Sequence, residues 1–269
     1  MTNDRISPLL RGRLPSLTTF GRLMLLVPEA PLLLLLVCGF LWGRSPLLGA
    51  LAAVVALNFG VRAAALYLAG WLLRAGRLGD ADALLRVAQV MHPWSADVLA
   101  LRGVLALLGG QARQAEVLLR SSAGLLPGRA AVYAAWSAAL IELGDGPQAA
   151  AVARQAIAAD KGCAAAYLHL AEAERQTGAS PMAVEDCLRA GLAVARDPET
   201  ETTLRCALAW HLVEQERCAE ARLATSGVEA TLRRCTEAHQ SRLRLRLCEL
   251  LVAQGQTERA RELLQGAAS

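Results

Sequence analysis

The chain has 269 residues, enough for one or two domains, and 54% of them are hydrophobic, 19% charged and 4% aromatic. Alanine and leucine dominate the apolar residues, which favours helices, and the β-branched and aromatic runs typical of strands are missing. The net charge is +4, but eight arginines against two acidic residues give residues 1–77 a charge of +6. This uneven distribution is typical of the flanks of a membrane segment rather than of a nucleic-acid-binding protein.

The N-terminal third is predicted to be a basic tail, residues 1–22, followed by a hydrophobic region, residues 23–71. We expect this region to form a transmembrane helical hairpin with limbs at about 23–42 and 47–71. A single span would place Arg44 near the middle of the bilayer, at a cost of about 2.5–3.5 kcal/mol. A hairpin avoids this cost, because Arg44 then lies in the turn.

The first limb of this hairpin is the weaker one. Pro28, Glu29 and Pro31 interrupt it and leave residues 32–42 as its continuous apolar stretch. A membrane-spanning helix needs about 20 residues, so residues 23–42 could dip into the bilayer instead of crossing it. A third interpretation is a soluble protein whose first helices form a buried cap.

Arginine positions predict the orientation of the hairpin. Four arginines precede the first limb, and Arg62, Arg74 and Arg77 end or follow the second, with only Arg44 between the limbs. The positive-inside rule then places both ends in the cytoplasm, at a bacterial-type inner membrane. Seven cysteines without a CxxC pair agree with a reducing compartment. The alternative is a single span that carries an extracytoplasmic repeat domain.

A 34-residue repeat follows the hydrophobic region. Glycines recur at this interval, and an alanine follows each of them by five residues. The glycines are Gly76, Gly110, Gly144 and Gly178, and the alanines are Ala81, Ala115, Ala149 and Ala183. This period is that of a helix–turn–helix unit, and such units stack into a solenoid because none can bury its apolar face alone.

Each unit also carries leucines, small residues and, in most cases, a closing proline. The first unit reads Leu68-Ala69, Leu72, Leu85, Ala88 and Pro93. In the third unit Lys161 replaces the proline, and in the fifth Glu216 stands where glycine is expected. On these residues the chain resembles the tetratricopeptide repeat (TPR) family over residues 62–269. The expected units are about 62–95, 96–129, 130–163, 164–201, 202–240 and 241–269.

The resemblance implies an all-α fold, a right-handed superhelix of helix pairs, with no general catalytic activity. The first repeat helix continues directly from the second apolar limb, without a glycine, serine or proline linker. We therefore expect one helix of about 29 residues from Leu47 to Ala75. A kink is expected at Asn58-Phe59-Gly60.

By resemblance, a protein partner would lie on the concave face, as an apolar helix or an extended peptide. The expected groove residues are Leu66, Tyr67, Ala100, Leu101, Val104, Leu108, Ala134, Ala138, Leu168, His169, Glu172 and Arg175. A clamp for acidic chaperone C-termini is disfavoured, because Leu66, Gly70, Leu101, Ala131 and Ala135 occupy the matching places. The protein's own N-terminal segment or a second copy, in a homo-oligomer, could fill this face instead.

No motif for catalysis, for a cofactor or for a metal is present, so we expect no enzyme activity, cofactor or metal site. The histidines fall in different units, and only His211 beside Trp210 merits inspection. The sequence predicts a membrane-anchored TPR scaffold for protein interaction at the cytoplasmic face, in contact with membrane lipid and without nucleic acid. An accessory subunit of an envelope complex fits this prediction. The alternatives are an extracytoplasmic assembly factor and a structural subunit of a larger membrane complex.

Overall fold

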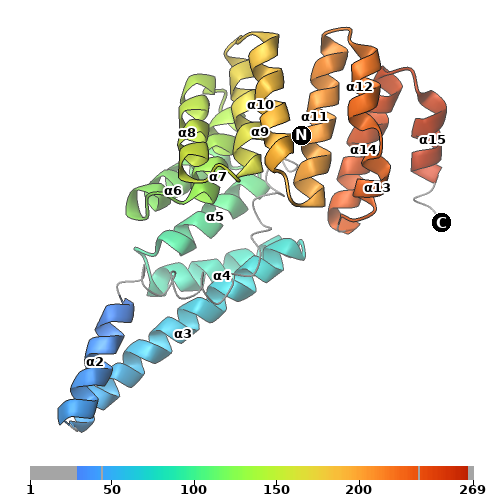
Figure 1. Ribbon diagram of the computed structural model, residues 1–269. Helices are drawn as coiled ribbons and strands as arrows, with labels where there is room; N and C mark the ends of the chain where they lie inside the picture. Colours follow the sequence, from blue (N-terminus) through green and yellow to red (C-terminus); the bar gives the residue numbers. More distant parts are fainter. Residues whose placement is uncertain (1–28, 44, 236, 266–269) are drawn as a thin grey trace. The chain divides into compact units, whose positions relative to one another are not determined.

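The computed structural model describes residues 29–43, 45–235 and 237–265, and all of its regular elements in these ranges are helices (Figure 1). These residues divide into two compact units, and the chain passes from one to the other between Pro93 and Trp94. The first unit contains α2 (Glu29–Gly43), α3 (Pro46–Arg74) and α4 (Leu78–Met91).

In the first unit α2 packs against the beginning of α3 (Figure 1). The contact is close: a Cβ on Gly49 would lie 2.8 Å from two carbons of the Phe40 ring. α3 then continues as one helix of 29 residues through 58–60, where a kink was expected, and its last part packs on α4. One helix therefore carries both the apolar limb and the beginning of the first repeat.

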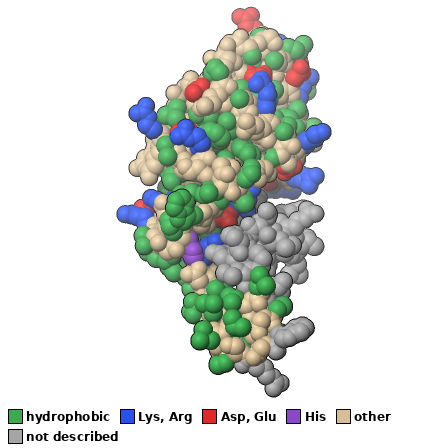
Figure 2. All heavy atoms as spheres, turned by 90° about the vertical axis from the view of Figure 1, so that its left-hand side faces the viewer, with side chains coloured by type: hydrophobic (Ala, Val, Ile, Leu, Met, Phe, Trp, Pro, Cys, Tyr) green, Lys and Arg blue, Asp and Glu red, His purple; other side chains and the backbone are tan. Residues whose placement is uncertain are grey.

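Apolar side chains cover much of the surface of α2 and of the first part of α3. Val54 is 63% exposed and Leu57 69% exposed, and on the face that Figure 2 shows, the described side chains at this end of the unit are mainly hydrophobic. Among the described residues, α3 is the one helix long and apolar enough to cross a membrane, over Pro46–Leu73. Only 11% of its most apolar stretch is buried, unlike the core helix of a soluble protein.

The first limb of the expected hairpin is not established as a span. Residues 23–28 lie outside the described residues, and α2 has 15 residues, fewer than the about 20 that a span needs. The described residues thus give one candidate span, and the transmembrane hairpin stays a prediction.

The second unit is an array of antiparallel helix pairs, each packed on the next pair. Its helices are α5 (Ala96–Leu108), α6 (Ala112–Leu125), α7 (Ala130–Glu142), α8 (Gly146–Ala159), α9 (Ala164–Gln176), α10 (Pro181–Val194), α11 (Pro198–Glu214), α12 (Cys218–Thr225), α13 (Val228–Leu232), α14 (Glu237–Ala253) and α15 (Thr257–Gln265). The first helices of neighbouring pairs also touch each other, α5 with α7, α7 with α9, and α9 and α14 with α11.

The turn within each pair has one backbone conformation. Its central residue is left-handed, with φ of 75° at Gly76, 79° at Gly144 and 74° at Gly255. The next amide bonds back to the first helix, as from Asp145 N to Leu140 O over 3.0 Å. Glycine is favoured here because it has no Cβ to clash. The fifth unit keeps this turn although Glu216 occupies the position, with φ of 60°.

The alanine that follows the turn explains why the spacing is so regular. Ala115 and Ala149 are fully buried, because the second helix of each pair lies directly on the first at this point. Larger residues fill the space beyond: Leu119 is also fully buried, and a Cβ on Gly103 would lie 2.5 Å from its Cγ. Small residues thus set the distance between the paired helices, and leucines fill the groove.

The fifth unit departs from a simple helix pair. α11 has 17 residues, whereas α12 has only 8 and a further helix of 5 residues, α13, follows it. Gly227, with φ of 76°, separates α12 from α13. The additional residues between the fourth and last units are thus accommodated by a longer first helix and a divided second helix.

Candidate partner-binding pocket

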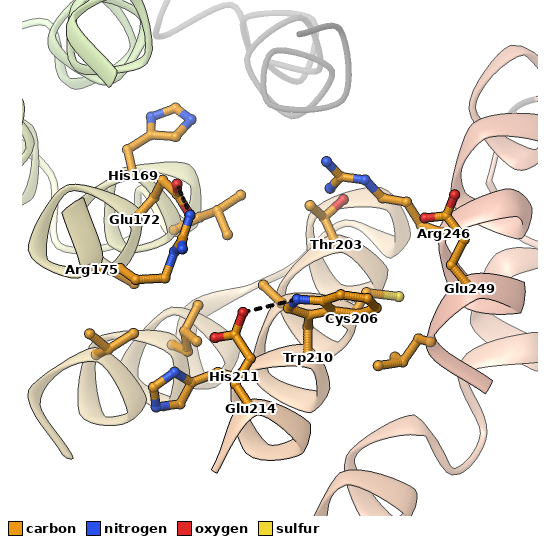
Figure 3. Close-up of a pocket in the computed structure, with 16 residues that line it drawn as sticks. His169, Glu172, Arg175, Thr203, Cys206, Trp210, His211, Glu214, Arg246 and Glu249 are labelled. Atoms are coloured by element: carbon orange, nitrogen blue, oxygen red, sulfur yellow. Dashed lines mark hydrogen bonds and ion pairs between the residues drawn. The ribbon is translucent and has the colours of Figure 1, made fainter. Parts of the chain in front are cut away.

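A pocket of about 370 Å³ lies between α9, α11 and α14, the first helices of three successive repeats (Figure 3). Leu168, Ala171, Val184, Leu188, Ala207 and Leu250 provide its apolar lining. Its polar and aromatic lining consists of His169, Glu172, Arg175, Thr203, Cys206, Trp210, His211, Glu214, Arg246 and Glu249.

The α9 wall follows from helical periodicity. Leu168, Glu172 and Arg175 are spaced four and three residues apart, so they share one face of the helix. Arg175 Nη2 lies 2.7 Å from Glu172 Oε1, and this hydrogen bond raises the pKa of the guanidinium. His169 is fully buried beside them. The α9 wall therefore presents an already paired cation to the pocket.

The α11 wall carries an aromatic ring and an imidazole. Trp210 is 44% exposed, and its Nε1 donates a hydrogen bond of 3.1 Å to Glu214 Oε1. His211 is 6% exposed, and its Nε2 lies 2.9 Å from the carbonyl oxygen of Pro181. Asp197 caps the helix by accepting a hydrogen bond from the Thr200 amide over 2.8 Å, which fixes where α11 begins.

The charges around the pocket are mixed, with an excess of carboxylates. α14 contributes Arg246 and Glu249 on the side opposite Arg175 (Figure 3). With Glu172 and Glu214, the pocket has three carboxylates against two guanidinium groups. The site thus combines an apolar floor with a charged rim that is negative by one unit, which suits a peptide better than a small apolar molecule.

Four of the expected groove residues come together at this pocket, namely Leu168, His169, Glu172 and Arg175. The others lie elsewhere. Ala100, Leu101 and Leu108 are half-buried on α5, and Val104 is buried there. Leu66 and Tyr67 belong to α3 in the first unit, and Tyr67 is exposed.

Ala134 and Ala138 on α7 do not lie on open surface, contrary to the expected groove. Both are buried. Ala134 packs with Ala156 and Ala166, and Ala138 belongs to the core between α5, α6 and α7. The reason is the small side chain, which allows the neighbouring helices to approach closely enough to cover it.

The sequence did not predict the α11 and α14 walls, apart from singling out His211 beside Trp210. The 34-residue register ends before α11, because additional residues precede the fifth unit. The spacing of three and four residues that places Leu168, Glu172 and Arg175 on one face also relates Thr203, Trp210 and Glu214. Helical periodicity alone therefore indicates that these α11 residues share one face, without the 34-residue register.

No group of three or more His, Cys, Asp or Glu residues in the described part of the chain is placed to hold a metal ion. The pocket residues form hydrogen bonds and ion pairs that orient one another, as between Trp210 and Glu214. Their arrangement can bind a ligand through shape, charge and hydrogen bonding.

Paired antiparallel helices, a left-handed turn residue and a buried alanine after the turn together define a TPR-type helical solenoid. Solved structures with this fold are similar to the chain. TTC0263, a TPR protein of Thermus thermophilus, aligns with a TM-score of 0.61 and 21% identity, over 71% of this chain and 99% of that one. PilF of Pseudomonas aeruginosa aligns with a TM-score of 0.58 and 18% identity, over 77% of this chain and 91% of its own.

PilW, a type IV pilus biogenesis factor, aligns with a TM-score of 0.59 and 17% identity, over 76% of this chain and 90% of its own. No protein-family model and no curated protein matches the sequence. At these identities the structural similarity shows the TPR fold.

Proposed function

We propose that this protein is a membrane-anchored TPR scaffold that holds a partner protein on the inner face of its repeats, at the cytoplasmic side of a membrane. It would be an accessory subunit of a membrane or envelope complex. The observation that carries the proposal is α3, since one helix exposes apolar side chains along its first part and begins the repeat array with its last part.

The length and exposure of α3 support the anchor. At 1.5 Å per residue, 28 residues extend about 42 Å, which exceeds a hydrocarbon core of about 30 Å. Leu47, Val54 and Leu57 are exposed on it and would be in contact with lipid tails. α2, packed beside α3, completes the proposed hairpin, and anchoring would raise the effective concentration of partners at the membrane.

Charge supports the cytoplasmic orientation. Arg5, Arg11, Arg13 and Arg22 precede the proposed hairpin, Arg74 is the last residue of its second helix, and Arg77 follows that helix. Arginine is retained on the cytoplasmic side of membrane helices. The repeat domain, which follows Arg77 in the chain, would then be cytoplasmic as well.

The inner face of the repeats supports partner binding. α5 presents partly exposed leucines, Leu101 and Leu108, and α9, α11 and α14 enclose the pocket. A partner helix or extended peptide with both apolar and charged side chains would match this surface. The expected groove residues on α5 and α9 are part of this proposal.

Two other functions share the fold. One is an extracytoplasmic assembly factor on a single span, and the description of PilW as a pilus biogenesis factor supports its role in assembly. A structural subunit of a larger membrane complex would bury the same inner face permanently. Topology separates the first of these from the main proposal, and fixed stoichiometry in purified complexes would favour the second.

Thiol labelling tests the anchor and its orientation. Ser45→Cys is introduced together with Cys38→Ser, because Cys38 is itself exposed, and spheroplasts are treated with a membrane-impermeant maleimide. We expect the introduced thiol to react in intact spheroplasts. The exposed Cys218 of the repeats should react only after lysis. Reaction of Cys218 before lysis would favour the extracytoplasmic alternative, and a protein found only in the soluble fraction would overturn the anchor.

Site-specific photocrosslinking tests the inner face. A photoreactive phenylalanine analogue at Leu101 should give a crosslinked partner band in membranes, whereas the same analogue at Leu223, exposed on α12, should not. Equal crosslinking at both positions, or at neither, would contradict a partner on the inner face.

A further inference from the structure

We propose that the pocket between α9, α11 and α14 binds a positively charged side chain of a partner peptide, held over Trp210 and against Glu214, Glu249 and His211. This inference rests on the proposed function, because it names the chemistry of the partner that the inner face would hold. Three features of the pocket support it: a hydrogen-bond acceptor without a donor, carboxylates on the rim, and an exposed aromatic ring.

The first feature is an acceptor with no donor. His211 Nε2 faces the Pro181 carbonyl oxygen at 2.9 Å. A carbonyl can only accept, so in the neutral ring Nε2 carries the proton and Nδ1 is left with a lone pair. His211 lines the pocket, its Nδ1 is buried, and none of the described residues donates to it. Leaving a buried acceptor without a hydrogen bond costs free energy, and an incoming N–H group would supply that bond.

The second feature is the charge of the rim. Among the described residues, no cation lies within ion-pair distance of Glu249, and Glu214, although its charge acts on Arg175, accepts its hydrogen bond from Trp210 rather than from a cation; both carboxylates can receive an external cation. The two cations of the pocket are already engaged: Arg175 with Glu172, and Arg246 in contacts of its own. An acidic ligand would therefore have to displace the existing partner of Arg175, whereas a basic ligand could approach Glu249 without breaking an ion pair between described residues.

The third feature is Trp210. Its indole N–H is held by Glu214, which fixes the ring in the middle of the pocket between the α9 and α14 walls (Figure 3). The ring is 44% exposed, so one part of it remains free to contact a ligand. The face of an indole attracts a guanidinium or an ammonium, and a carboxylate beside the ring strengthens this attraction. The apolar floor can take the aliphatic part of the same side chain or its neighbour.

The probes are short peptides, titrated calorimetrically into the full chain in non-ionic detergent micelles. They are acetyl-Ala-Arg-Leu-Arg-Ala-amide and the two peptides in which both arginines are replaced by glutamine or by glutamate. We expect the arginine peptide to bind about fivefold more tightly than the glutamine peptide, and the glutamate peptide more weakly than both. The preference should decrease at high salt, because salt screens the attraction between the arginines of the peptide and the carboxylates of the pocket.

Substitutions assign the preference to this pocket. Glu214→Gln with Glu249→Gln should bring the affinities for the arginine and glutamine peptides together, and Trp210→Leu should weaken the arginine peptide selectively. Glu262→Gln, on the exposed face of α15, is the matched control and should leave the preference unchanged. Circular dichroism confirms that each variant remains helical. An unchanged preference in the Glu214 and Glu249 variant would overturn the inference.

The remaining outcomes are distinct. If the glutamine peptide binds as tightly as the arginine peptide, the inner face binds peptides without a charge preference; the inference then fails and the proposed function stands. If no peptide binds, the inference fails and the topology and crosslinking tests decide the function separately. If Arg5→Gln, Arg11→Gln and Arg13→Gln together increase the affinity of the full chain for the arginine peptide, the chain's own basic tail competes for the pocket. That result would overturn the partner as its occupant.

Discussion

Leucine and valine side chains of α3 lie exposed in the first unit, whereas leucines of the same size are fully buried between the paired helices of the second. Leu57 and Leu119 illustrate the contrast. Both belong to Ala- and Leu-rich helices, so composition alone does not distinguish them. The difference is one of coverage: a repeat helix packs on its partner and also on the neighbouring pair, while the first part of α3 packs on α2 and leaves large apolar side chains exposed.

The largest expected effect tests the burial side of this comparison. Leu119→Ala should lower the free energy of unfolding of the repeats by about 2–5 kcal/mol, since it leaves a cavity in the packed core. Leu57→Ala should change it little, because that side chain is 69% exposed. Chemical denaturation in detergent, followed by circular dichroism, measures both. Equal losses would mean that α3 is packed against protein rather than lipid.

An arginine introduced into each unit tests whether α3 is inserted in a membrane. Val54→Arg should disfavour insertion of α3 by about 2.5–3.5 kcal/mol and shift the protein out of the carbonate-resistant membrane fraction. Leu223→Arg on α12 is the control, because Leu223 is exposed on a helix of the repeats and the substitution should leave fractionation unchanged. If the Val54 variant remains in the membrane pellet to the same extent as the control, α3 does not span.

Two glycines, one in each unit, differ in how much room the neighbouring helices leave for a side chain. Gly103→Val should destabilise the repeats by about 1–3 kcal/mol, because the new side chain would overlap the buried Leu119. Gly60→Ala on α3 meets nothing within 4 Å and should be neutral or stabilise the helix by up to about 1 kcal/mol. Thermal unfolding monitored by helical circular dichroism compares the two variants. A stable Gly103 variant would show that α5 and α6 can separate more readily than their contacts indicate.

The turn of the fifth unit offers a smaller effect. Glu216 has φ of 60°, a conformation that costs most residues about 1–2 kcal/mol. Glu216→Gly should therefore raise stability by about 0.5–1 kcal/mol after the greater freedom of glycine in the unfolded chain is counted. Gly144→Ala, at the same place in the third unit, should lower it by a similar amount. Melting temperatures that move in the same direction for both variants would contradict a shared turn.

The smallest effect concerns thiol reactivity. Burial, and then the negative charge of Glu174, raises the pKa of the Cys187 thiol to about 11. A raised pKa keeps the thiol neutral in the folded protein, so iodoacetamide at about pH 8 should label the exposed Cys218 and leave Cys187 largely unmodified. Labelling of Cys187 should increase as the pH rises from the ordinary thiol pKa of 9.0 to about 11, and the stability that the neutral thiol contributes is lost over the same range. Rapid labelling at about pH 8, measured by mass spectrometry, would show that the α9–α10 contact opens.

The repeat positions could be predicted from the sequence because a turn conformation requires the glycine and a close helix contact requires the alanine. Gly110 must be left-handed and Ala115 must be small, whatever the rest of the chain does, so their spacing reveals the paired helices. The sequence indicates the fifth unit less clearly, because its left-handed turn residue is Glu216 instead of a glycine. The α11 wall of the pocket was not predicted for a different reason, since α11 lies beyond the last regular 34-residue interval.

The sequence by itself determined the all-helical TPR fold, the 34-residue unit and the apolar character of α3, because each depends on residues close together in the chain. Only the tertiary structure decided which small residues of the expected inner face are open and which, like Ala134, are covered. It alone also brought Arg175, Trp210 and Glu249 to one pocket. These arrangements depend on how helices from three successive repeats approach one another, and that distance is set by packing rather than by any local pattern.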